Sequence, residues 1–300
     1  MTGIYPTLEA TSIENRLAAI HTCESLMGKP TKGATILGLH LEGNYLNMQM
    51  KGGQPAQYIS NPEPEEYKAL LESTNCIKRW SVSPELPGAL ELGKYASEKG
   101  VLVSLAHTVA DYPLVRKAFE AGYTHATHFY NAMTGVHREG EFKREGTIES
   151  IYLMDDITVE LVADGIHVPP AILQLVHKLK GAEKTALVTD AMSAAAYPDF
   201  SRISESRVII EDGVCKLADR SAIAGSIATS DRLIRTMVHQ AELPLTEVIR
   251  MASEAPARIM NIFDKKGSLE KGKEADIIIF DPDINLQMTI IEGEVVYRKS

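Results

Sequence analysis

The sequence predicts an α/β protein built on a parallel (β/α) barrel. Seven short apolar, β-branched runs bounded by turn residues recur along the 300 residues, as is typical of buried parallel strands. Amphipathic stretches of helical period separate most of these runs, and alternating strands and helices imply right-handed parallel crossovers. Polar residues follow the expected ends of five different strands. A barrel gathers these ends at one mouth, whereas a doubly wound sheet spreads them along an edge, so the barrel is favoured.

The expected elements alternate in chain order. Strands are predicted at 3–8, 34–43, 76–85, 100–108, 123–131, 157–165 and 184–192. Helices are predicted at 13–26, 64–73, 87–100, 111–122 and 169–181. Gly100, Gly122 and Gly181 follow apolar helical patterns, as helix C-caps do. A complete barrel has eight strands, so one strand is missing from this prediction.

The pattern changes after Met192. Short extended pieces are expected at 206–213, 214–218 and 222–226, followed by helices at 229–242 and 245–261. The tail contains apolar runs separated by Asp-Pro and Glu-Gly turns, which indicates strands. We therefore expect two domains, an incomplete barrel over 1–262 and a small β-strand appendage over 263–300.

Composition restricts the partners and the compartment. Lys and Arg number 31 against 40 Asp and Glu, a formal charge of −9, which argues against nucleic acid as a partner. The three cysteines have no Cys-x-x-Cys spacing and are odd in number, so the sequence predicts neither a disulfide framework nor a thiolate zinc site. No apolar run is long enough to span a bilayer, and the first residues lack a signal-peptide pattern. The expectation is a cytoplasmic protein that does not bind membranes.

Several polar residues at the strand ends are candidates for chemistry. The set comprises His40, Glu42, His107, Thr108, His128, Asn131, Asp164, His167 and Asp190. Metal ligands are lone-pair donors at fixed positions, and barrel strand ends bring such donors together from distant segments. Glu42, His107 and His128 fit this requirement. Three protein ligands that leave one position for water are typical of a catalytic site.

Each residue also has an ordinary structural interpretation. A single histidine at a strand end is more often hydrogen-bonded than a ligand, and Arg138 could be a surface charge. Asp190 could be a helix N-cap and Asp164 a turn former. His125 and His128 lie three residues apart on one expected strand and point to opposite faces, so at most one faces the mouth.

The motifs GLHLEGNYLN, LAHT, THATHFYNAM, HRE, ELVADGIHV, VTDAM and IAGS occur in this order. In these motifs the chain resembles the N-acetylglucosamine-6-phosphate deacetylase family of the amidohydrolase superfamily, from about residue 3 to residue 298. The resemblance implies a deacetylase in amino-sugar metabolism that acts as a homodimer on a sugar phosphate.

The resemblance also implies roles for individual residues. Glu42, His107 and His128 match the metal ligands of the family, and Asp190 matches its catalytic acid and base. One divalent metal per chain is expected; zinc suits this donor set, and iron or manganese is compatible with it. His167 would help to stabilise the oxyanion. The implied substrate contacts are Gly53, Gln54, Asn131, Ala132, Arg138, Asp164, Gly165, Ile166, His167, Ile223, Ala224 and Gly225.

The chain departs from the family at its start and in its sugar contacts. Members usually begin with strands of a small β-sandwich, followed by a first barrel strand that ends in His-x-His or Gln-x-Asn. Neither pattern occurs here. The resemblance therefore implies that the appendage over 263–300 is the remnant of a small β-sandwich. A longer native protein, a strand supplied by a partner chain and a degenerate relative are three explanations, of which the sequence favours the first. HLEGN, AHT and Gly53-Gln54 replace the usual HLEGP, GHS and a small residue followed by His. Because these changes affect sugar contacts, a related substrate such as N-acetylgalactosamine 6-phosphate is an alternative, and a non-catalytic sugar-phosphate-binding protein is another.

Overall fold

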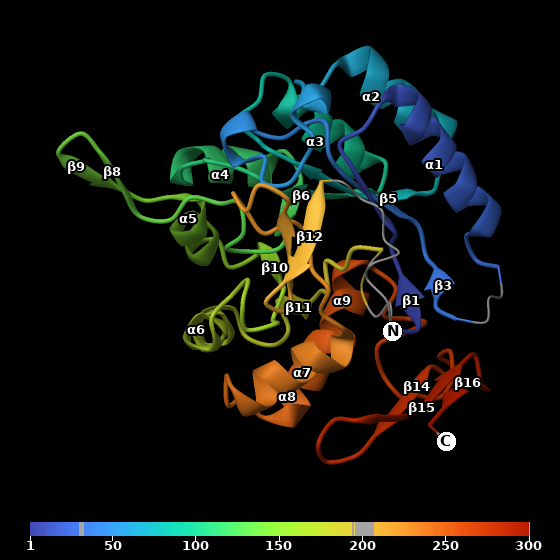
Figure 1. Cartoon of the computed structure of the whole chain (residues 1–300). Coiled ribbons are helices and arrows are strands. Elements are labelled where there is room, and N and C mark those ends of the chain that lie inside the picture. The colour runs from blue at the N-terminus through green and yellow to red at the C-terminus, as the bar shows by residue number, and fades with distance from the viewer. Residues whose placement is uncertain (30–32, 194, 196–206, 300) are drawn as a thin grey trace.

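A seven-stranded parallel sheet forms the centre of the protein, which is described here by a computed structural model (Figure 1). The structure describes residues 1–29, 33–193, 195 and 207–299. The strand order is β11-β10-β7-β6-β5-β4-β2, and every pairing is parallel. The strands are β2 (Thr7–Glu9), β4 (Leu39–Glu42), β5 (Ile77–Val82), β6 (Leu102–Leu105), β7 (Tyr123–Ala126), β10 (Thr158–Leu161) and β11 (Thr185–Leu187). All seven predicted strands are confirmed, in a curled sheet of the TIM-barrel type.

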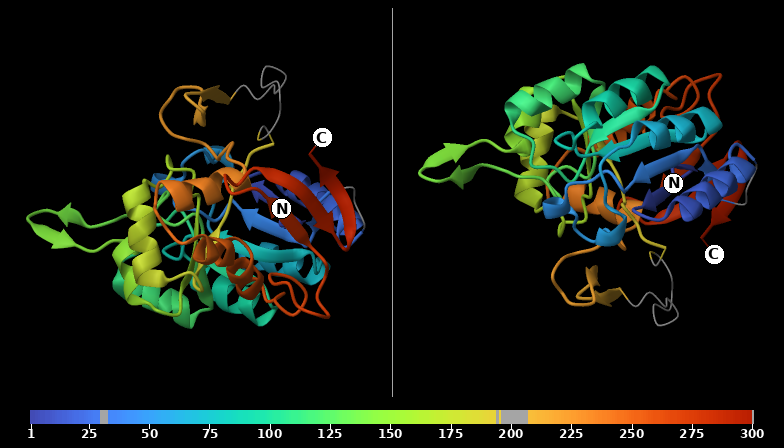
Figure 2. Two further views of the ribbon diagram at one scale, coloured as in Figure 1. Left: turned by 90° about the horizontal axis from the view of Figure 1, so that it is seen from below. Right: turned by 90° about the horizontal axis from the view of Figure 1, so that it is seen from above.

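Helices cover the outer side of this sheet (Figures 1 and 2). The five predicted between strands are confirmed as α1 (Ile13–Leu26), α2 (Pro64–Ser73), α3 (Ala89–Glu98), α4 (Tyr112–Glu120) and α6 (Pro170–Lys180). Their apolar sides form one core with the sheet, in which Trp80 of β5 stacks on Tyr45 with ring centroids 5.5 Å apart. Gly181 ends α6 with a φ of 73°, a backbone conformation that favours glycine.

Several short elements were not predicted. They are the 3₁₀ turns Met48–Met50 and Ala56–Tyr58, the hairpin strands β8 (His137–Glu139) and β9 (Phe142–Arg144), and helix α5 (Thr147–Leu153). The strands predicted over 3–8 and 34–43 are each divided in two, because β1 (Gly3–Ile4) pairs with β3 (Thr35–Ile36) in a small sheet apart from β2 and β4. The hairpin is exposed along its length and projects from the body as an arm (Figures 1 and 2). Its charged sequence carries no apolar alternation, which explains why it gave no strand signal.

Two predictions after Met192 need correction. The helix predicted over 245–261 is two helices, α8 (Leu245–Ala252) and α9 (Glu254–Ile259), separated at Ser253. Pro256 has no backbone N–H to donate to the carbonyl four residues earlier, so a continuous helix is disfavoured there. The segment 222–226 forms only isolated bridges: Ile223 pairs with Lys216, and Ser226 pairs with Ala191. The other elements are confirmed as β12 (Val208–Glu211), β13 (Val214–Leu217) and α7 (Ser230–His239); residue 206 of the first predicted piece lies outside the described residues.

The tail forms a separate antiparallel sheet of β14 (Ile277–Phe280), β15 (Leu286–Ile291) and β16 (Glu294–Arg298). Its apolar residues include the exposed Ile279 and Val295. The strand content of the tail is therefore confirmed, while the division into domains at residue 262 stays a prediction. In the described part of the chain, no helix has the length and apolar character needed to cross a membrane.

His40 should make the metal-free protein sensitive to acid. Its buried ring lies between Thr7 Oγ1, 3.1 Å from Nδ1, and Ser81 Oγ, 2.8 Å from Nε2. Burial, with the nearby Arg79 charge, lowers the pKa of His40 to about 3. The unfolded chain binds a proton here near pH 6.5 and the folded chain does not, so folding stability should decrease as pH falls from about 6.5 towards 3, by up to ~1.4 kcal/mol per pH unit.

Denaturant unfolding at pH 7, 6 and 5 would measure this effect. His40→Gln is the matched control, because an amide can keep polar contacts with Thr7 and Ser81 without taking up a proton. We expect a shallower pH dependence in this variant. Equal slopes for the two proteins would contradict the assignment to His40.

Candidate active site

Three buried side chains converge at the carboxyl ends of the strands β4, β6 and β7. Glu42 is the last residue of β4, and His107 and His128 each follow the last residue of β6 and β7 by two positions. The two Nε2 atoms lie 3.1 Å apart, and Glu42 Oε1 lies 3.4 Å from each of them. One ligand atom from each residue thus falls within 4.8 Å of the others, so the group could hold a metal ion. The predicted convergence is present in the structure.

Backbone and neighbouring groups fix the orientation of these side chains. His107 and His128 have φ values of 46° and 31°, which turn the chain sharply after each strand. His107 Nδ1 donates to the carbonyl oxygen of Met50 at 2.6 Å, which leaves the Nε2 lone pair directed at the cluster. The Gln54 amide donates to the Glu42 carbonyl at 3.0 Å and to Glu42 Oε1 at 3.4 Å, and it accepts from Ala10 N at 2.8 Å.

The electrostatics of the cluster favour a positive charge. Burial alone would raise the pKa of Glu42, but His128 and His107 hold it well below its usual value. Burial alone would lower the pKa of His128, but the Glu42 charge raises it to about 9. In the metal-free chain a proton therefore sits among these groups at neutral pH. Two facing imidazole nitrogens and a carboxylate without that proton are a donor set that fits a divalent metal.

Asp190 lies three residues beyond β11 and is half-buried. Its φ is 48°, and its carbonyl oxygen accepts from Ser226 N at 2.8 Å, which anchors the turn after the strand. Burial, with the neighbouring Glu42 charge, raises the pKa of Asp190 to about 7. A carboxyl group with a pKa near neutrality can both accept and return a proton. Asp190, the predicted acid and base, is close enough to Glu42 and His128 for their charges to shift its pKa.

Asp164 and His167 form a hydrogen-bonded pair after β10. His167 Nδ1 lies 2.8 Å from Asp164 Oδ2, and Asp164 Oδ1 accepts from the backbone N–H groups of Ile166 and His167 at 2.9 Å each. Gly165 completes this turn with a φ of 80°. Both oxygens of Asp164 therefore have partners within the turn, and its observed role is to orient His167 with Nε2 free for another group.

The remaining predicted substrate contacts lie in three places. Asn131 donates to the carbonyl oxygen of His128 at 3.1 Å, and Ala132 follows it with a φ of 52°. A Cβ built on Gly53 would lie 3.0 Å from the Cβ of Ala224, so the Gly53-Gln54 loop packs directly on the Ile223–Gly225 turn. Arg138 differs from all of these, because it is exposed on the projecting arm (Figure 1).

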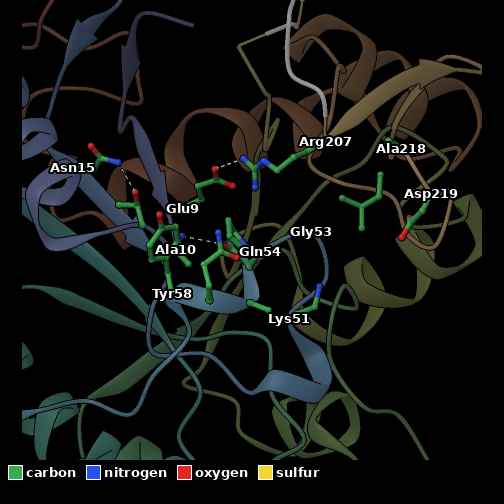
Figure 3. A pocket seen from close by; sticks show the side chains of 15 residues that line it. Glu9, Ala10, Asn15, Lys51, Gly53, Gln54, Tyr58, Arg207, Ala218 and Asp219 are labelled. Atoms are coloured by element: carbon green, nitrogen blue, oxygen red, sulfur yellow. Dashed lines mark hydrogen bonds and ion pairs between the residues drawn. The ribbon is translucent and has the colours of Figure 1, made fainter.

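A cavity of about 500 Å³ lies on the other side of the Gly53-Gln54 loop. Figure 3 shows Gln54 pointing towards Ala10 and the ion pair between Glu9 and Arg207 across the cavity. Lys51 and Asp219 also line it. Of the predicted site residues, only Gly53 and Gln54 line this cavity. The cavity therefore adjoins the cluster of Glu42, His107 and His128, which we call the metal-ligand cluster, without containing it.

The comparisons with known proteins place the chain in one family. The model of the amidohydrolase family matches residues 11–296. The chain belongs to this family. It is 32% identical to N-acetylglucosamine-6-phosphate deacetylase of Haemophilus influenzae, over 98% of this chain and 75% of that protein. It is also 32% identical to N-acetylgalactosamine-6-phosphate deacetylase of Escherichia coli O157:H7, over 97% of this chain and 76% of that protein.

A solved structure shows the same relationship. A mutant of N-acetyl-D-glucosamine-6-phosphate deacetylase from Mycobacterium smegmatis, in complex with N-acetyl-D-glucosamine-6-phosphate, superposes with a TM-score of 0.88. The identity is 29%, and the match covers 98% of this chain and 76% of the other. The chain therefore spans about three quarters of the length of these three relatives, and about two thirds of the length of the Bacillus subtilis relative.

Proposed function

We propose that this chain hydrolyses the acetamide of N-acetylglucosamine 6-phosphate to glucosamine 6-phosphate and acetate, in amino-sugar catabolism. The observation that carries the proposal is the convergence of Glu42, His107 and His128, with the half-buried Asp190 close enough to Glu42 and His128 for their charges to shift its pKa. This arrangement offers a metal site and a carboxylate of matched pKa, the two parts that amide hydrolysis at neutral pH requires. Similarity to the deacetylases over nearly the whole chain supports the choice of substrate.

Glu42, His107 and His128 would hold one divalent metal, for which zinc is our first choice. One carboxylate and two imidazoles suit zinc and are compatible with iron or manganese. When bound, such a metal lowers the pKa of a coordinated water from ~15.7 towards ~7 and polarises a carbonyl oxygen.

The residues around this position carry the proton transfers. Asp190 accepts the proton of the attacking water and returns it to the nitrogen of the leaving amine, as its pKa near neutrality permits. His167, held at Nδ1 by Asp164, stabilises the oxyanion of the tetrahedral intermediate by donating a hydrogen bond from Nε2–H. The sugar phosphate would contact Gly53, Gln54, Asn131, Ala132, the 164–167 turn and the Ile223–Gly225 turn.

The proposed phosphate contact of Arg138 depends on the proposed homodimer. Arg138 is on the exposed arm, and Val136 and Phe142 of the same arm are 56% and 67% exposed. Exposed apolar side chains on a projecting hairpin suit a protein partner. We propose that this partner is a second copy of the chain and that the guanidinium of Arg138 binds the phosphate there, with the fork geometry that suits phosphate. A cytoplasmic location fits the three buried cysteines, none of which forms a disulfide within the described residues.

Arg138→Met should raise KM for the sugar phosphate about tenfold or more and leave kcat nearly unchanged. The phosphate is remote from the scissile amide, so its contact contributes equally to the ground state and the transition state. Steady-state kinetics would measure both constants. Arg144→Met, on the same arm, is the matched control; an equal rise in KM for this control would show that the arm, and not the Arg138 contact, is responsible.

The epimer with an axial 4-hydroxyl is a second candidate substrate. The relative from Escherichia coli O157:H7 acts on N-acetylgalactosamine 6-phosphate by its name, and this chain has Gln54 at a proposed sugar contact. Comparison of kcat/KM for the two epimers would decide between them. A purified chain that binds either sugar phosphate by calorimetry without acetate release would instead support a non-catalytic binding protein.

A further inference from the structure

A buried ion pair crosses the interior of the barrel directly beneath the metal-ligand cluster. Arg79 of β5 binds Glu160 of β10 through two parallel hydrogen bonds, Nη1 to Oε2 and Nη2 to Oε1, each 2.6 Å long. Both side chains are less than a tenth exposed. Charged residues are rarely buried this deeply, and an ion pair here must recover a large loss of hydration. The burial of the Arg79–Glu160 pair therefore needs a reason other than packing.

The pair holds the segment that carries His128. Glu160 Oε1 accepts from the backbone N–H of His128 at 3.1 Å, and the Glu160 carbonyl accepts from Phe129 N at 2.8 Å. Arg79 Nη2 donates to Thr127 Oγ1 at 2.7 Å. The side chains of Arg79 and Glu160 thus hold Thr127 and His128, and the Glu160 backbone holds Phe129.

This segment needs such support because its backbone is strained. His128 has a φ of 31°, a conformation that is disfavoured for a residue with a Cβ and persists only where the surroundings enforce it. The turn directs Nε2 of His128 towards Glu42 and His107. Nδ1 of His128 is buried and has no hydrogen-bond partner among the described residues. Unlike His107, whose ring is held by Met50, His128 is oriented through its backbone.

We infer that the Arg79–Glu160 ion pair positions His128 as a metal ligand. This inference rests on the proposed metal site and adds two positioning residues to it, neither of which touches the metal-ligand atoms. The bidentate contact fixes the Glu160 carboxylate, the carboxylate fixes the His128 N–H, and the enforced turn fixes Nε2. Loss of the pair lets the turn relax and moves one of three ligands away from the other two.

Metal affinity, measured by competition with a chromophoric chelator, is the test. In Glu160→Gln we expect the Kd for Zn²⁺ to rise about 10- to 100-fold, the range found when groups that orient ligands are removed. Arg79→Lys keeps the charge but loses the fork, so a smaller rise is expected. The visible absorption bands of the Co²⁺-loaded protein should shift in both variants, because the ligand geometry changes.

A control separates positioning from stability. Lys266 binds both Asp276 and Glu274 next to the tail sheet, and the Asp276 side chain is 8% exposed, so Asp276→Asn weakens a comparably buried ion pair far from Glu42, His107 and His128 in sequence. This control should lower the thermal midpoint of the metal-free protein and leave the Zn²⁺ Kd unchanged. The double variant Arg79→Met, Glu160→Met removes both charges together and should recover stability without recovering affinity.

Each outcome decides the inference. An unchanged Kd in folded Glu160→Gln and Arg79→Lys, or an equal rise in Asp276→Asn, would overturn it. If Glu160→Gln does not fold, Arg79→Lys decides alone, since it retains the buried charge. If the wild type and the variants bind Zn²⁺ with equal affinity, only the positioning role is refuted. If the wild type binds no Zn²⁺, the proposed metal site is refuted as well.

Discussion

Asp190→Asn is expected to reduce turnover of N-acetylglucosamine 6-phosphate at least about a thousandfold, with metal binding retained. General acid and base catalysis each contribute roughly 10²- to 10⁴-fold, and Asp190 serves both steps in the proposed mechanism. Asparagine has nearly the same shape but cannot accept a proton. Because Asp190 is not among the three converging ligand residues, the Zn²⁺ content should stay the same. Acetate release and elemental analysis on the same samples measure both quantities.

The pH profile provides a further check on this role. Asp190 must be deprotonated to accept a proton, so kcat/KM of the wild type should fall as pH drops through the pKa of its carboxyl group. Burial and the Glu42 charge place that pKa at about 7 without metal, and a cation in the cluster lowers it. We expect the acid limb at or below pH 7. A variant that retains a rate close to that of the wild type would refute the assignment.

Much of the fold follows from the sequence because parallel strands buried on both faces are continuous apolar runs. The runs around Leu41, Val103 and Val159 were sufficient to locate β4, β6 and β10, and the remaining strands followed in the same way. The predictions that failed concerned short, local elements. The break between α8 and α9 at Ser253 could have been predicted only from the single proline, Pro256, that follows it. The strands β8 and β9 of the arm are exposed on both faces, so they show no alternation of apolar and polar residues.

The convergence of Glu42, His107 and His128 was predictable because strand ends of a barrel meet at one mouth. The pairing of Arg79 with Glu160 was not. The two residues lie within different strands, where neither charge gives a sign of its partner 81 positions away. A charged residue at an inward position of a buried strand is nevertheless a signal, because it must be paired. The contacts of Gln54 with Ala10 and Glu42 and of Met50 with His107 depend on loop geometry, which carries no periodic pattern.

Glu42→Gln is expected to weaken Zn²⁺ binding about a hundredfold or more and to abolish turnover at limiting metal. The change keeps the volume of the side chain but removes the charge that draws a cation between His107 and His128. Its effect can be seen without metal as well, because that same charge raises the pKa of His128 to about 9. In the variant, burial is no longer opposed, so the His128 pKa should fall below 6.5.

NMR titration of the metal-free protein would follow the His128 ring, and calorimetry would follow Zn²⁺ binding. In the wild type, His128 gains a partner on folding, so its stabilising contribution is complete below about pH 6.5 and is lost as pH rises through about 9. Glu42→Gln should remove this loss. Glu85→Gln, in a carboxylate that binds Asn47 and Thr108 near the same mouth, is the matched control and should leave the His128 titration unchanged. If Glu42→Gln alters neither the His128 pKa nor the Zn²⁺ affinity, Glu42 is not the group that attracts the cation, and the proposed metal site is wrong.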